Sequence, residues 1–200
     1  MIDPTHWQRL READTEDVTR RSLAVHDPQT QTCRLRVLGA EVVVDPTQEN
    51  VAWAEGGVEK PPGFFDWLVA VVYLLSARDE APTGQWASPQ ALPYGEFYFR
   101  GPHELPTAKL AEAFGSDAAA FDRAAREIGG ERWTQGRHAF VLPALPRVPI
   151  LIQLWEADDE FPARASFHFD RNACDHLPLD ALQSLAIMAA KRLLNVGDKG

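Results

Sequence analysis

The residues best suited to chemistry lie in and just after a short acidic segment, residues 156–160. Clustered carboxylates and an imidazole are common ligands for divalent metal ions. Because the side chains of a strand alternate between its two faces, His168 and Asp170 of the next predicted strand point the same way. A divalent-metal-dependent enzyme built on this segment would use Asp158, Glu160, His168 and Asp170 as its metal ligands.

The same residues have simpler interpretations. Asp158 and Asp159 form a dipeptide that favours turns, and the polar face of an antiparallel strand is normally the solvent-facing one. Asp175 and His176 come just before Pro178, where helix starts favour acidic and capping residues. No recognised metal-ligand spacing occurs in the segment, so the acidic hairpin could equally be a solvated turn.

A second candidate site is the long stretch from Thr83 to His103, which is rich in prolines, glycines and aromatic residues. Small-molecule sites usually have apolar or aromatic walls and a few polar groups. We therefore expect a ligand pocket with walls from Trp86, Tyr94, Tyr98 and Trp155, and with Arg100 and Asp158 as polar anchors. The alternative is that the aromatic side chains only hold an irregular loop against the core.

The elements that must position these candidates follow from the hydrophobic pattern. Residues 64–77 are apolar on almost every face, which predicts a buried central helix after the Pro61–Pro62–Gly63 breaker. Alternating apolar residues predict a hairpin at 34–45, a short strand at 51–53, and strands at 137–142, 150–155 and 164–169. Further helices are predicted at 4–24, 105–114, 117–128 and 179–194.

Strands and helices in this order predict an α+β fold, not a doubly wound one. We expect a single domain over residues 1–200, in which residues 1–30 form a peripheral, partly helical segment. Its sheet should be mainly antiparallel, with about five strands, and should pack against the central helix and the C-terminal helix.

Composition restricts the classes of function. The 200 residues carry a net charge of −9, which argues against nucleic acid and anionic membranes as partners. The longest apolar run, residues 67–75, is too short to span a bilayer, and residues 1–14 lack a signal-peptide core. Cys33 and Cys174 are too few for an iron–sulfur or zinc framework. We expect a cytoplasmic protein that binds a small molecule or a protein partner.

Several segments resemble one family in their order along the chain. They are Leu74–Leu75 with Ala77, Thr83–Trp86, Leu92–Gly95, Phe114–Gly115, Ile128–Gly130, Pro146–Ile150, Leu154–Pro162, Phe169–Asp170 and Leu177–Pro178. Together they resemble the family catalogued as domain of unknown function 3786, over nearly the whole chain, and Leu154–Pro162 is the most specific stretch.

The resemblance implies no catalytic residues. Some members look fused to a cysteine-rich iron–sulfur segment, and some occur in anaerobes that use corrinoid methyl transfer, but this chain has no cysteine cluster to hold such a group. The resemblance suggests that six positions matter to fold or function: Trp86, Gly95, Trp155, Asp158, Glu160 and Asp170. Between the two functional hypotheses, the sequence favours a non-catalytic binding protein with an aromatic and acidic pocket over the metal-dependent enzyme.

Overall fold

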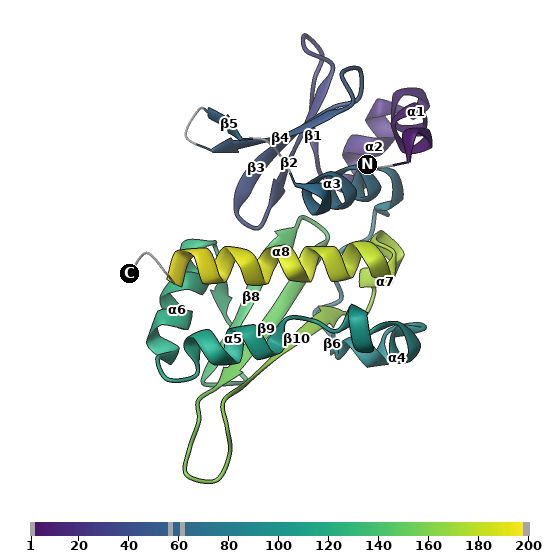
Figure 1. The fold of residues 1–200 in the computed structure, drawn as a ribbon. Helices are drawn as coiled ribbons and strands as arrows, with labels where there is room; N and C mark the ends of the chain where they lie inside the picture. The colour runs from purple at the N-terminus through teal and green to yellow at the C-terminus, as the bar shows by residue number, and fades with distance from the viewer. Residues whose placement is uncertain (1–2, 56–57, 61–62, 198–200) are drawn as a thin grey trace.

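The computed structural model describes residues 3–55, 58–60 and 63–197, and within them ten strands form two antiparallel five-stranded sheets (Figure 1). The N-terminal sheet has the order β1-β2-β3-β4-β5, and the C-terminal sheet has the order β6-β10-β9-β8-β7. The predicted α+β class is confirmed. The strands expected in one sheet divide between two, because the N-terminal strands pair only with each other.

The N-terminal sheet is a meander whose strands follow one another in sequence. Its strands are β1 (Val25–Asp27), β2 (Thr32–Val37), β3 (Ala40–Asp45), β4 (Asn50–Glu55) and β5 (Val58–Lys60). The predicted hairpin at 34–45 is confirmed as β2 and β3, and the predicted strand at 51–53 is confirmed within β4. The turn between β2 and β3 uses Leu38 and Gly39, both with positive φ, as in a two-residue type I′ turn.

The N-terminal segment forms two helices, α1 (Pro4–Glu12) and α2 (Thr15–Ser22), where the sequence predicted one. The break occurs because Asp14 is the N-cap of α2 and its carboxylate accepts a hydrogen bond from the Glu16 N–H at 3.0 Å. Trp7 of α1 is 2% exposed and packs edge-on against Trp67, with ring centroids 5.6 Å apart. The segment is therefore packed against the central helix.

The central helix is α3 (Phe64–Ser76), as predicted. Gly63 caps it, and the Asp66 carboxylate accepts a hydrogen bond from the Gly63 N–H at 2.6 Å. Pro61 and Pro62 of the predicted breaker lie outside the described residues. Fully buried residues on opposite faces of α3, such as Val69 and Val71, confirm that the helix is central.

The C-terminal sheet consists of β6 (Trp86–Ala87), β7 (Glu131–Arg132), β8 (His138–Leu145), β9 (Val148–Trp155) and β10 (Arg164–Asp170). The longer helices beside it are α5 (Thr107–Phe114), α6 (Ala118–Glu127) and α8 (Leu179–Gly197). The short helical turns are η1 (Pro89–Ala91), α4 (Gly95–Tyr98), η2 (Gly101–His103) and α7 (Ala173–His176). The stretch from Thr83 to His103, predicted to be a long loop, thus contains β6 and three of these short turns.

Helix α6 packs against one face of the C-terminal sheet. Phe140 of β8 packs edge-on against Phe121 of α6, with ring centroids 5.9 Å apart, so this face of β8 is the helix side. Because side chains alternate along a strand, Val141 faces the other way. In Figure 1, α8 crosses the molecule between the N-terminal sheet with α3 and the C-terminal sheet with α5 and α6.

Candidate functional site

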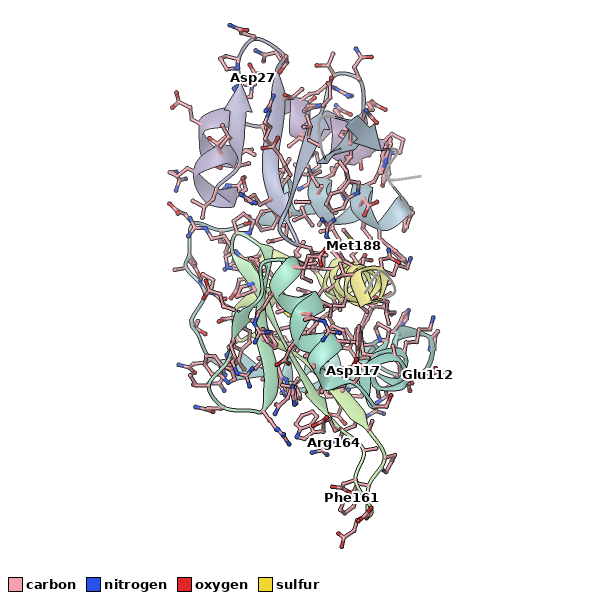
Figure 2. The ribbon with its side chains drawn as sticks, turned by 90° about the vertical axis from the view of Figure 1, so that its left-hand side faces the viewer. Asp27, Glu112, Asp117, Phe161, Arg164 and Met188 are labelled. Atoms are coloured by element: carbon pink, nitrogen blue, oxygen red, sulfur yellow. The ribbon has the colours of Figure 1, made fainter. Side chains whose placement is uncertain are left out.

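The acidic segment forms the end of a hairpin that extends beyond the C-terminal sheet. Asp158 shapes its tip, because one carboxylate oxygen accepts hydrogen bonds from the N–H groups of Glu160 at 2.9 Å and Phe161 at 2.7 Å. Figure 2 shows Phe161 at this tip, away from the body of the molecule, and Arg164 near the base of the hairpin. Glu160 is exposed.

A hollow of about 810 Å³ lies at the base of this hairpin, and we call it the hairpin hollow. It is lined by Gly136, Arg137, His138, Gln153, Leu154, Trp155, Glu156, Ala157, Asp158, Phe161, Pro162 and Arg164. Two of the residues predicted from the sequence, Trp155 and Asp158, therefore share one hollow.

The indole of Trp155 forms an aromatic wall of the hairpin hollow. Trp155 is half-buried and pairs across the strands with Arg164, whose guanidinium carbon lies 4.2 Å from the centroid of the indole. Such a contact is a cation–π interaction. Gly136 lies over the neighbouring strand, where a Cβ would come within 2.6 Å of the Gln153 side-chain nitrogen. A larger residue at position 136 would therefore displace part of the lining.

A buried acidic and imidazole pair supports the hollow from the helix side. Asp122 of α6 accepts a hydrogen bond from Nδ1 of His138 at 2.8 Å, and Arg132 donates to its second oxygen at 3.0 Å. Nε2 of His138 lies 3.5 Å from a Glu156 oxygen and is buried with no hydrogen-bond partner. Asp122 thus fixes the ring orientation of His138, and Glu156 lies at the hollow between this ring and Arg137, whose guanidinium is 3.7 Å from the Glu156 carboxylate.

Sequence reasoning missed Asp122, His138 and Arg164. Arg164 could have been found, because a hairpin with a tip at 158–161 places residues 155 and 164 opposite each other. Asp122 and His138 come from a helix and a strand that meet only in the tertiary structure, so no local pattern relates them.

The candidate metal ligands lie apart from one another. Asp170 is fully buried at the far end of β10 and accepts hydrogen bonds from Thr83 and Gly84, whereas Asp158 and Glu160 lie at the hairpin tip. His168 is half-buried between them, and burial lowers the pKa of its imidazole. Within the described residues, no group of three or more histidine, cysteine, aspartate or glutamate side chains is arranged to hold a metal ion.

The four remaining pocket residues do not line the hairpin hollow in the part of the chain that the structure describes. Trp86 packs edge-on against Trp133, with ring centroids 5.9 Å apart. Tyr98 stacks on His103 at 4.5 Å and donates a hydrogen bond to the Gln183 side chain. Tyr94 is 82% exposed, and Arg100 forms an exposed ion pair with Glu96. Trp86 and Tyr98 therefore pack the loop against its neighbours.

The fold and the hollow define a class: an α+β protein with two antiparallel sheets, a central helix and an aromatic, charged hollow beneath a hairpin. Residues 14–192 match the model of the family described as "Domain of unknown function (DUF3786)", so the chain belongs to this family. No curated protein and no solved structure matches it. Among the described helices, none has the length and apolar character needed to cross a membrane.

Proposed function

We propose that this chain is a non-catalytic binding protein and that the hairpin hollow is its site for a small organic molecule. The observation that carries the proposal is the hollow itself. Its volume of about 810 Å³ falls within the roughly 300–1,000 Å³ typical of small-molecule sites. It joins a half-buried indole to charged groups of both signs, and this combination can fix the orientation of a ligand.

The lining indicates the kind of ligand. The indole of Trp155 already holds one planar cation, the guanidinium of Arg164, at 4.2 Å. A planar or cationic group of a ligand could make the same kind of contact with this indole. The carboxylates of Glu156 and Asp158 lie in the same lining and can accept hydrogen bonds from donor groups. We expect a ligand that combines a planar or cationic part with hydrogen-bond donors.

The side chains of the lining favour binding over catalysis. Its described residues include no serine, threonine, cysteine or lysine to act as a nucleophile. Its two carboxylates already have partners: Asp158 accepts two N–H groups of the hairpin tip, and Glu156 lies 3.7 Å from Arg137. The one imidazole nitrogen that faces Glu156, Nε2 of His138, is buried within the protein and does not reach the open part of the hollow. These features support a site that holds a molecule without reacting with it.

Native mass spectrometry of the purified protein tests the proposal. We expect an extra mass in the native spectrum that disappears when the same sample is denatured. The Trp155→Ala variant should lose most of this mass, because the aromatic wall is removed. A native spectrum that contains only the bare chain would refute the proposal.

Trp53 provides a matched control. It is also a partly buried tryptophan under an arginine, with the Arg192 guanidinium 5.3 Å from its ring, but it belongs to the N-terminal sheet. Trp53→Ala should retain the extra mass. If Trp155→Ala fails to fold by circular dichroism, Glu156→Gln replaces it. The Glu156 carboxylate is part of the lining and its side chain is 41% exposed, so this change should weaken binding without unfolding the chain. Equal loss in the Trp53 and Trp155 variants would contradict the site assignment.

A further inference from the structure

A second hollow, distinct from the hairpin hollow, lies where the two sheets meet. We call it the inter-sheet groove, and its volume is about 770 Å³. The sheets are joined there by a hydrogen bond from the Leu38 N–H, at the tip of the β2–β3 turn, to the Ala144 carbonyl of β8 at 3.0 Å. The groove is lined by Leu23, Val25, Arg34, Leu35, Arg36, Glu41, Pro82, Gly129, Glu131, Val141, Pro143, Leu145, Pro146 and Pro149.

One wall of the groove offers almost no hydrogen-bond donors. Four of its residues are prolines, Pro82, Pro143, Pro146 and Pro149, and proline has no backbone N–H. Val141 of β8 lies among them on the face of the sheet that α6 does not cover. This wall therefore suits hydrocarbon or aromatic surface much better than a polar group.

The opposite wall exposes two large apolar side chains. Leu23 is 53% exposed and Val25 is 67% exposed. Leu23 caps α2 with φ at 58°, a left-handed conformation that glycine or asparagine adopts at lower cost. A leucine that is both strained and exposed beside an apolar groove has no role in the core, which points to a role in binding.

The charged residues of the groove balance one another. Arg34 lies 3.6 Å from Glu41, and Arg36 donates a hydrogen bond to the Gly39 carbonyl at 2.9 Å. Glu131 completes a set of two cations and two anions. Because the formal charges of these four residues sum to zero, the groove has no net charge that would favour an ionic ligand over a neutral one.

We propose that the inter-sheet groove binds an uncharged, mainly apolar small molecule. Its volume fits a single molecule of this kind, its walls are aliphatic and proline-rich, and its charges are balanced. This site is separate in position and chemistry from the hairpin hollow, and it stands whether or not the hairpin hollow binds a ligand.

The neutral fluorescent probe N-phenyl-1-naphthylamine tests the proposal on the full chain. We expect saturable binding of one probe per chain, followed by fluorescence titration. The anionic probe 8-anilinonaphthalene-1-sulfonate should bind at least about tenfold more weakly, because its sulfonate would lose water against a wall whose prolines have no N–H groups to replace it. Equal or tighter binding of the anionic probe would overturn the assignment of ligand class.

Variants of the exposed wall test the position of the site. Val25→Asp should weaken binding of the neutral probe by at least about tenfold, because it places a charge in the apolar wall. Leu23→Asn should also weaken binding while keeping the helix cap, since asparagine tolerates the left-handed conformation. Phe97→Asp is the matched control, because Phe97 is 77% exposed on α4 and lies outside the groove.

Two outcomes would overturn the proposal. One is a Phe97→Asp variant that loses as much probe binding as Val25→Asp, which would indicate adhesion to exposed apolar residues in general. The other combines two results: the native mass spectrum shows a dimer that the Val25→Asp change converts to monomer, and the wild-type chain does not bind the neutral probe. In that case the occupant of the groove would be a second copy of the chain.

Discussion

Asp170 is the residue whose replacement should have the largest and best-defined effect on stability. Its carboxylate is fully buried. One oxygen accepts hydrogen bonds from the Thr83 N–H at 3.0 Å, the Thr83 hydroxyl at 2.7 Å and the Asn172 N–H at 3.2 Å, and the other accepts from the Gly84 N–H at 2.7 Å. Asp170 thus ties the loop after α3 to the end of β10.

The expected magnitudes follow from this arrangement. Asp170→Ala removes a buried acceptor from these part-buried donors, and loss of such a network costs about 3–5 kcal/mol in the free energy of unfolding. Asp170→Asn keeps one oxygen but places an NH₂ group against the Gly84 N–H, so we expect a loss of about 2–3 kcal/mol. Thr83→Val removes only the hydroxyl, at a cost of about 1 kcal/mol.

Urea unfolding followed by circular dichroism measures these losses. At roughly 2–4 °C per kcal/mol for a chain of this size, Asp170→Ala should also lower Tm by about 6–20 °C. Asp158→Asn is the matched control, because Asp158 also accepts two backbone hydrogen bonds but lies at the exposed hairpin tip, so its loss should stay below about 1 kcal/mol. An Asp170→Asn variant as stable as wild type would refute the account of Asp170 as a structural carboxylate.

Three further predictions concern stability and reactivity. Burial lowers the pKa of His176 from its ordinary 6.5. As the pH falls below about 6.5, the unfolded chain therefore protonates before the folded chain, and the free energy of unfolding should decrease. Urea unfolding across this pH range should show a smaller decrease for His176→Gln than for the wild-type chain. Gly39→Ala should cost at least about 2 kcal/mol, because φ is 79° and the new Cβ would lie 2.6 Å from the Ile128 carbonyl oxygen; a variant with unchanged urea midpoint would disprove this. Burial, with a smaller contribution from Asp175, raises the pKa of Cys174 to about 11, so iodoacetamide at neutral pH should leave this thiol unmodified in the folded protein and alkylate it after unfolding, as peptide mass spectrometry would show.

Local patterns were enough to predict most elements of the fold. The hairpin at β2 and β3 alternates between buried and less buried residues, and α3 is apolar on nearly every face, so each element is defined by its own residues. The strands predicted at 137–142, 150–155 and 164–169 are β8, β9 and β10, with ends that differ by at most three residues. The two-residue strands β6 and β7 are too short to show any periodicity, so the sequence did not predict them.

The division into two sheets could not be predicted from the same patterns. The residues of β3 or β9 alone do not determine the strands with which β3 and β9 pair, because pairing depends on register and on distant partners. The candidate pocket shows the same limit. Trp155 and Asp158 share a hollow because they lie close together in one hairpin. Trp86 of β6 instead packs against Trp133, which follows β7 at the other edge of the sheet.

The packing of α3 against α8 has a consequence for how the chain is made. α3 ends at Ser76 and α8 covers it, but α8 (Leu179–Gly197) is synthesised roughly 100 residues later. At a synthesis rate of about 5–20 residues per second, the roughly 100 residues between the two helices take about 5–20 s to add. Throughout this interval the most apolar helix of the chain lacks its main cover, so the nascent chain should depend on chaperones until α8 leaves the ribosome.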